Sequence, residues 1–193
     1  MVNQSSISRT ENYLSFYLTP QYQALLSTMA LAEIIHLDAS EIVAIPEMPS
    51  AVAGVCSWQG EVLWVVDLSY WSGGAPLLSS TSTLSESRKQ DPIAEFTRTE
   101  SHCNILKVRC QGGALGLLVY QVGQLKSCEM QQIQSWKNGT ALSPLTRDHQ
   151  GQITAQHKQP TVRQECIKGI WNSPSGEQLP ILDLDIVVQH LVQ

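Results

Sequence analysis

Short stretches of the chain alternate hydrophobic and polar residues, which is the period of β-strands that bury one face. In the first stretch Leu14, Phe16 and Leu18 share a face, and the turn signal TPQ separates it from YQALL, so the chain is predicted to open on a hairpin. Two single strands should follow, the second ended by a proline. The strands predicted in this part of the chain are 12–18, 22–26, 29–37 and 41–46.

Three further hairpins are predicted from pairs of alternating stretches with a turn signal between them. The segment LKSCEMQQIQSW predicts one more strand that leads into a short turn. Near the C-terminus, Leu184, Val187, Val188 and Leu191 recur at helical spacing, so a short amphipathic helix should end the fold. The paired stretches are 55–59 with 62–68 around a turn at Gly60-Glu61, 103–110 with 114–120, and 166–171 with 178–184.

One nine-residue phrase occurs twice, as GEVLWVVDL from residue 60 and as GEQLPILDL from residue 176, 116 residues later. This distance is too long for solenoid repeats and indicates two related lobes. Both copies are apolar on both faces, which is typical of a strand enclosed between a barrel interior and a second layer. We therefore predict a mainly β fold of two small five-stranded antiparallel β-barrels side by side, with a short C-terminal helix. The pattern leaves open whether strands cross between the lobes.

The composition changes after the second strand of the first repeated hairpin. The following segment is rich in Ser, Thr and charged residues without a clean period, which indicates a flexible or poorly packed connection. The N-terminal residues resemble a flexible tail. The predicted organisation is a tail at 1–11 and one domain at 12–193, made of a first half at 12–74, the connection at 75–102 and a second half at 103–193.

Charge is distributed unevenly along the chain, whose net charge is −5. Residues 1–87 carry one basic residue against eight acidic ones, whereas residues 88–193 carry eleven against nine. This split argues against nucleic-acid binding, which needs a basic stripe. It is compatible with lobes that meet different protein surfaces, and equally with a solvated surface of uneven charge. Without a signal peptide or an apolar run of about 20 residues, the protein is expected to be soluble and cytoplasmic.

The sequence contains few motifs that would indicate catalysis or the binding of a metal or cofactor. The five cysteines are odd in number and include no C-x-x-C pair, so neither a disulfide framework nor a metal site is predicted, and no cofactor motif or nucleophile motif occurs. The repeated Asp67 and Asp183 invite a reading as paired catalytic carboxylates. Each ends a strand just before a turn or helix, however, so we predict that they are structural caps. A binding role therefore fits better than catalysis.

Three ordered segments resemble the CheW family of chemotaxis coupling proteins: EIIHLDASEIVAIPEMPSAVAGVCSWQGEVLWVVDL, ALGLLVYQVGQL and CIKGIWNSPSGEQLPILDLD. The resemblance spans about residues 12–193 and implies SH3-like barrels without enzymatic activity. It further implies an adaptor that joins the cytoplasmic tips of chemoreceptors to the regulatory domain of a CheA-type histidine kinase. Such an adaptor would act in chemotaxis, phototaxis or pilus motility, and would be recruited from the cytoplasm to receptor arrays at the membrane without inserting into it.

Four residues are predicted to bind partners, namely Glu33, Trp58, Gln59 and Trp64. The family arginine that often pairs with the glutamate matching Glu33 is Gln59 here, so Glu33 is expected to lack its partner. Relatives carry proline where this chain has Trp64. Because aromatic residues are favoured interface anchors, we expect Trp58 or Trp64, and preferentially Trp64, to be exposed for a partner.

The sequence is also compatible with two alternative functions. The first is a divergent scaffold that associates with itself through its lobes and has lost receptor coupling. The second is a small-molecule-binding or hydrolytic protein that uses the cleft between the lobes.

Overall fold

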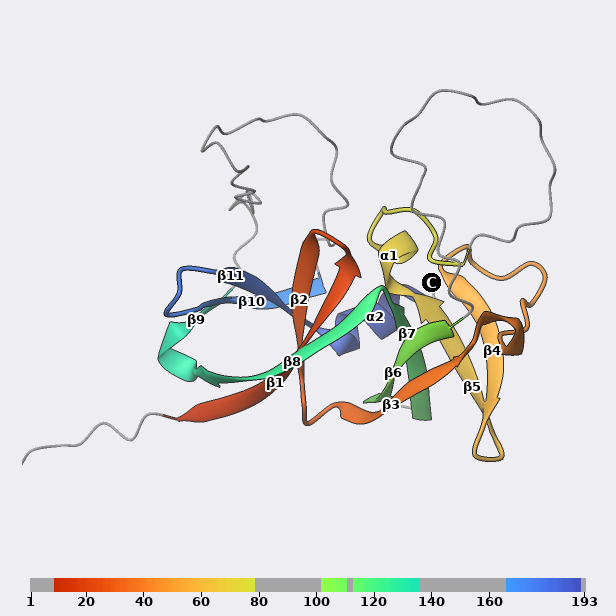
Figure 1. Ribbon diagram of the computed structural model, residues 1–193, viewed down its shortest axis with the longest axis horizontal. Helices are drawn as coiled ribbons and strands as arrows, with labels where there is room; N and C mark the ends of the chain where they lie inside the picture. Colours follow the sequence, from red (N-terminus) through yellow and green to blue (C-terminus); the bar gives the residue numbers. More distant parts are fainter. Residues whose placement is uncertain (1–8, 79–101, 111–112, 136–165, 192–193) are drawn as a thin grey trace, which may run out of the picture.

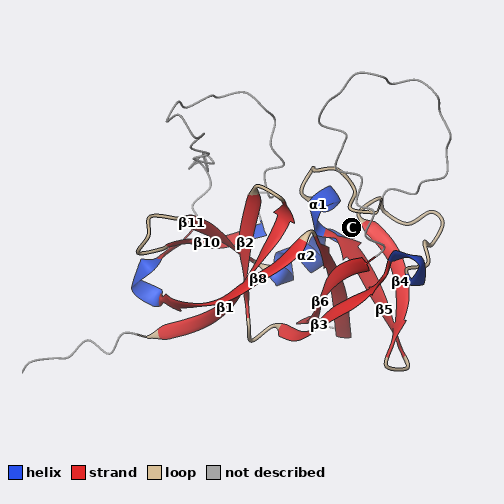
Figure 2. Ribbon diagram, in the orientation of Figure 1, coloured by secondary structure: helices blue, strands red, loops and turns tan. Residues whose placement is uncertain are grey.

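The computed structural model describes residues 9–78, 102–110, 113–135 and 166–191. It shows two β-rich lobes side by side, with short helices at the ends of strands (Figures 1 and 2). The predicted mainly β, two-lobed fold is therefore confirmed. In the described part of the chain, no helix has the length and hydrophobicity that a membrane crossing requires.

Each lobe is built on one sheet. Lobe A has the strand order β8-β1-β2-β11-β10-β9, and lobe B has the order β3-β6-β7-β5-β4. The strands of lobe A are β1 (Thr10–Thr19), β2 (Tyr22–Ser27), β8 (Gln121–Glu129), β9 (Ile133–Ser135), β10 (Ile167–Asn172) and β11 (Gln178–Leu182). Those of lobe B are β3 (Leu31–Asp38), β4 (Val52–Trp58), β5 (Glu61–Asp67), β6 (His102–Cys110) and β7 (Gly113–Val119). The helices are η1 (Ala39–Glu41), α1 (Leu68–Trp71), η2 (Met130–Gln132) and α2 (Leu184–Leu191).

Strands do cross between the lobes, so the predicted sequence halves do not coincide with them. The strands of lobe B come from one continuous stretch, 31–119, whereas those of lobe A come from 10–27 and 121–182. The first hairpin of the chain lies beside the last one, because β2 pairs with β11 at Leu25 and Ile181. That pairing is parallel, as is β5 with β7, so the expectation of purely antiparallel barrels is wrong at these two places.

The duplicated phrase marks equivalent hairpins of the two lobes. The β4–β5 hairpin ends at Asp67 and leads into α1, and the β10–β11 hairpin ends just before Asp183 and leads into α2. A 3-10 helix follows the corresponding strands β3 and β8. The residues after η1 then reach β4 through a single bridge between Val43 and Val55, and the residues after η2 form β9, which pairs with β10. In each lobe, the residues after the 3-10 helix therefore connect the first strand of the sheet order to the opposite end of the sheet, and this connection closes the barrel.

Three clusters of buried side chains form the core. Each lobe has its own interior, with Ile35 and Val65 in lobe B and Leu25 and Trp171 in lobe A. The largest cluster lies between the lobes and includes Phe16, which is fully buried. It explains why several strands are apolar on both faces: one face fills a barrel interior and the other packs against the opposite lobe. We call it the inter-lobe core, and its remaining members are Leu14, Leu18, Ala24, Leu26, Leu68, Trp71, Leu106, Val108, Leu117, Val119, Cys166, Ile167, Leu182, Leu184 and Val187.

Local differences from the predicted elements have simple causes. The strand expected at 41–46 is reduced to the bridge at Val43, because η1 occupies its first residue and this segment meets β4 only at Val55. The turn of the β4–β5 hairpin is Gln59-Gly60, one residue earlier than predicted, since both residues have positive φ and Trp58 pairs with Glu61. Most of the predicted connection, 79–101, and the tail residues 1–8 lie outside the described residues, and β1 begins at Thr10.

Candidate partner-binding site

Three of the four predicted partner-binding residues, Glu33, Trp58 and Gln59, come together at the tip of one hairpin of lobe B, whereas Trp64 alternates with the buried Leu63 and Val65 and faces away from the lobe interior. Trp58 ends β4, Gln59 begins the turn that follows, and Trp64 lies on β5 of the same hairpin. Glu33 lies on β3, at the opposite edge of the sheet. Figure 1 shows the tip of the β4–β5 hairpin projecting beyond the other strands of lobe B.

Glu33 has partners, and the expectation that it lacks one is wrong. The indole Nε1 of Trp58 donates to Glu33 Oε2 at 3.0 Å, and the amide Nε2 of Gln59 donates to Glu33 Oε1 at 3.2 Å. Gln59 is placed for this bond by a left-handed backbone conformation, with φ of 51°. The carboxylate is therefore hydrogen-bonded by two neutral groups, although this chain has no arginine at position 59.

A second polar contact ties the hairpin to lobe B. Lys107 Nζ on β6 lies 3.2 Å from Glu61 Oε2 at the start of β5. The Lys107 side chain is 13% exposed and the Glu61 side chain 71% exposed, so water screens the pair from one side. The residue types gave no signal for this pair, because Glu61 and Lys107 are 46 residues apart and only the β5–β7–β6 order brings them together.

Trp64 lies on an apolar surface that the inter-lobe core leaves uncovered. It is 41% exposed, and Val62 and Val43 are 71% and 59% exposed. Strand pairing places Val43, Val55, Trp64 and Leu115 in one row across lobe B. We call Val43, Val55, Val62 and Trp64 the Trp64 face, and Leu115 continues the row to the inter-lobe core, against which it packs. The side chains of the Trp64 face are all uncharged and hydrophobic, so this face can bury apolar area against another protein without desolvating a charge.

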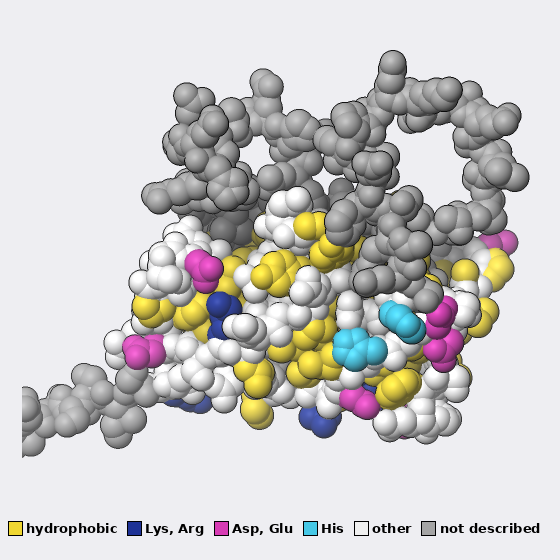
Figure 3. All heavy atoms as spheres, viewed as in Figure 1, with side chains coloured by type: hydrophobic (Ala, Val, Ile, Leu, Met, Phe, Trp, Pro, Cys, Tyr) yellow, Lys and Arg dark blue, Asp and Glu magenta, His cyan; other side chains and the backbone are white. Residues whose placement is uncertain are grey.

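A different surface of lobe B is polar. On the face shown in Figure 3, acidic and histidine side chains gather where β3 and β6 meet, with few basic ones nearby. Strand pairing accounts for part of this group, since His36 lies opposite Asn104 and Asp38 opposite His102. Among the residues the structure describes, no three histidine, cysteine or acidic side chains are placed to hold a metal ion.

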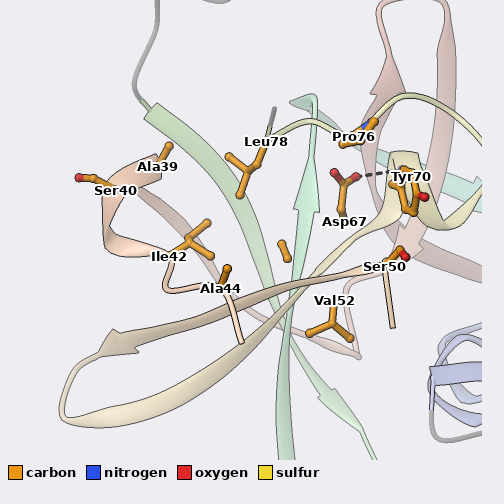
Figure 4. Close-up of a pocket in the computed structure, with 11 residues that line it drawn as sticks. Ala39, Ser40, Ile42, Ala44, Ser50, Val52, Asp67, Tyr70, Pro76 and Leu78 are labelled. Carbon is orange, nitrogen blue, oxygen red and sulfur yellow. Dashed lines mark hydrogen bonds between the residues drawn. The ribbon is translucent and has the colours of Figure 1, made fainter. Parts of the chain in front are cut away.

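A pocket of about 580 Å³ lies in lobe B rather than between the lobes. Figure 4 shows apolar side chains along one side, among them Ile42 and Leu78, and Asp67 with Tyr70 on the other. Asp183 is not among the lining residues. The repeated acids therefore do not face each other across this pocket.

Both repeated aspartates accept backbone hydrogen bonds at helix starts. Asp67 Oδ1 accepts from the N–H of Tyr70 at 3.0 Å, and its Oδ2 accepts from the N–H of Leu77 at 2.6 Å. Asp183 Oδ1 accepts from the N–H groups of Asp185 and Ile186 at 3.1 and 3.4 Å. The bonds from Tyr70, Asp185 and Ile186 satisfy N–H groups that a helix leaves open at its first turn, and the bond from Leu77 holds the loop that follows α1. Burial raises the pKa of Asp67, which is 3% exposed, while the backbone hydrogen bonds oppose that rise.

Replacing Asp67 by alanine should lower the free energy of unfolding by about 2–3 kcal/mol, because the partly buried N–H groups of Tyr70 and Leu77 lose their acceptor. The raised pKa means that the folded protein binds this proton more readily than the unfolded chain does. The Asp67 carboxyl therefore contributes its full stabilisation at pH values below 3.8, its ordinary pKa. This contribution is lost as the pH rises through the pKa that the group has in the folded protein. Urea denaturation at several pH values should thus show the gap between wild type and Asp67→Ala widening towards acid. If the difference in unfolding free energy between wild type and Asp67→Ala instead became smaller towards acid pH, the hydrogen bonds would have a larger effect than burial on the pKa of Asp67.

Comparisons with known proteins agree with this architecture. The model of the CheW-like domain family matches residues 12–192. The crystal structure of the scaffolding protein TtCheW from Thermoanaerobacter tengcongensis is similar with a TM-score of 0.63 at 16% identity, over 93% of this chain and 92% of that one. A search of curated protein sequences gives no match. Because the family model spans nearly the whole chain, the protein belongs to the family of CheW-like domains.

Proposed function

We propose that this protein is a non-enzymatic adaptor that couples chemoreceptors to a CheA-type histidine kinase. Family membership over residues 12–192 supports a coupling role. The two lobes offer two separate surfaces, so one molecule can hold two neighbours at once. On this proposal the protein acts in the cytoplasm and reaches membrane arrays of a chemotaxis, phototaxis or pilus-motility system through the receptors.

The observation that carries the proposal is the uncovered Trp64 face. Trp64 is 41% exposed, whereas Pro180, at the matching position of the repeated phrase in lobe A, is buried. A tryptophan contributes a large apolar area with few rotatable bonds, so ordering it at an interface costs little conformational entropy. We propose that the β4–β5 hairpin is the partner-binding element and that Trp64 is its central contact.

The repeated acids support an adaptor over an enzyme. Asp67 and Asp183 each accept hydrogen bonds at the start of a helix, in different lobes. This role accounts for their recurrence without any chemistry. The pocket beside Asp67 has a largely aliphatic lining, which offers few groups for acid–base catalysis.

The proposal is tested by titrating the regulatory domain of the cognate histidine kinase with the full-length protein in a calorimeter. We expect saturable binding with a Kd of about 10 µM or tighter, which is ordinary for a transient protein interface. Absence of binding to the regulatory domain of every such kinase of the organism would refute the proposal. Light scattering of the protein alone shows whether the Trp64 face instead binds a second copy.

Trp64→Lys should weaken that binding by about tenfold or more, because it places a charge at the centre of an apolar contact. Folding should be little affected, since the side chain is already 41% exposed. The matched control is Leu125→Lys, an equally charged change at a residue of lobe A that is 70% exposed. Equal weakening by both variants, with unchanged circular dichroism, would show that the Trp64 face is not the contact.

A further inference from the structure

We infer that Glu33 is a positioning residue, which holds the tip of the β4–β5 hairpin against β3 and does not itself contact a partner. We call Glu33, Trp58 and Gln59 the latch. The latch would determine how the hairpin presents the Trp64 face to a partner. The binding experiment described below rests on the function proposed above.

The hairpin tip needs a tether because of its place in the sheet. β3 and β4 are the first and last strands of the lobe B sheet, and among the described residues β4 pairs with β5 and, at one residue, with Val43. That bridge lies at Val55, and Trp58 and Glu61 form the last pair before the turn. Beyond Val55, the tip is therefore supported by side chains and by its own pairing.

Glu33 supplies this support from the opposite edge of the sheet. Each carboxylate oxygen accepts one bond from the tip, one from the Trp58 indole at 3.0 Å and one from the Gln59 amide at 3.2 Å. The Trp58 ring also packs against the interior of lobe B, so the latch connects the hairpin tip to the core of that lobe. The ion pair between Lys107 and Glu61 is a second tether beside it.

Lobe A makes the same kind of connection with the opposite charge. Lys126 on β8, the strand that corresponds to β3, places its Nζ 5.6 Å from the ring centroid of Trp171 on β10. The same Nζ lies 3.6 Å from Glu177 Oε2 in the turn of the β10–β11 hairpin. In both lobes a charged side chain thus joins a tryptophan and a turn residue of the equivalent hairpin. Both lobes therefore hold this hairpin with a charged side chain, which is acidic in lobe B and basic in lobe A.

This role makes a prediction that a direct charge contact does not make. Glu33→Gln removes the charge but keeps an amide oxygen that can accept from Trp58 or Gln59, whereas Glu33→Ala removes every acceptor. If Glu33 acts through the hairpin, the glutamine variant should behave nearly like wild type. If Glu33 pairs with a cation of the partner, both variants should fail alike.

The test has one arm without a partner and one with it. Hydrogen exchange of residues 57–62 in the free full-length protein should accelerate by about tenfold in Glu33→Ala and by about twofold or less in Glu33→Gln. The Kd for the kinase regulatory domain should rise by about tenfold in Glu33→Ala and by about twofold or less in Glu33→Gln. Trp58→Phe, which keeps the ring and removes the N–H donor, replaces Glu33→Ala if that variant does not fold. Lys107→Ala is the control for loss of the second tether.

The outcomes separate the latch from the proposed function. Unchanged exchange in Glu33→Ala and Trp58→Phe would overturn the latch, and equal loss of binding in Glu33→Gln and Glu33→Ala would overturn the indirect role. If the wild type does not bind the kinase domain, the function proposed above fails, while the exchange arm still decides whether Glu33 holds the hairpin.

Discussion

Gly54→Ala is expected to lower the free energy of unfolding by about 3 kcal/mol or more, through a clash and a strained backbone together. Gly54 has φ of +146°, and a Cβ built on it would lie 2.2 Å from the carbonyl oxygen of Val43. This is the point at which the segment after η1 crosses β4 and closes lobe B. The added methyl group must therefore push apart the bridge between Val43 and Val55, and chemical denaturation of the purified variant measures the loss.

Gly113→Ala is the matched control for this experiment. Gly113 has nearly the same φ, +142°, but a Cβ there would meet nothing within 4 Å. It should therefore show the backbone strain alone, and Gly54→Ala should exceed it by about 1–3 kcal/mol. Equal losses in the two variants would mean that the close approach of Val43 to β4 does not exist in solution.

Phe16→Ala is expected to destabilise the whole protein by about 3–5 kcal/mol in a single transition. Phe16 is fully buried in the inter-lobe core, where side chains from both lobes meet. Each lobe has its own interior, but both also bury apolar side chains in this shared core, so separating the lobes would expose those side chains to water. Loss of the ring should therefore be felt in both lobes, and thermal unfolding followed by circular dichroism and by tryptophan fluorescence should coincide.

The control is Leu125→Ala on β8 of the same lobe, where a leucine that is 70% exposed should cost about 0.5 kcal/mol or less. Two separate transitions in Phe16→Ala, with the lobe B transition at its wild-type position, would contradict a shared core.

The strands were predictable because their signal is local. The alternation of Leu14, Phe16 and Leu18 is visible in seven residues, and all four predicted hairpins are present. The repeated phrase also correctly predicted two lobes. Which hairpins share a lobe was not predictable, since the contact between Leu25 and Ile181 joins residues that are far apart in the chain. The two copies of the repeated phrase, which form β5 and β11, are both apolar, so the pattern does not show which of them lies beside β2.

The four residues proposed for partner binding remain a prediction, and the bonds that three of them make were not predictable. The resemblance to the CheW family implied an arginine partner for Glu33, and its replacement by Gln59 suggested that this partner was lost. The actual donors are an indole and an amide, which are neutral and have no charge pattern to reveal them. They reach Glu33 only because the sheet brings its first and last strands together. Trp64 was singled out because proline stands there in relatives, and its exposure follows from the inter-lobe core ending before β5.

The most direct test of the adaptor role is co-sedimentation of three purified components: a membrane-embedded chemoreceptor, its histidine kinase and this protein. The account predicts that the kinase sediments with receptor membranes when the wild-type protein is present, and that Trp64→Lys reduces the sedimented kinase several-fold. Kinase that sediments equally well without this protein, or that never joins the receptor membranes in its presence, would contradict the coupling role.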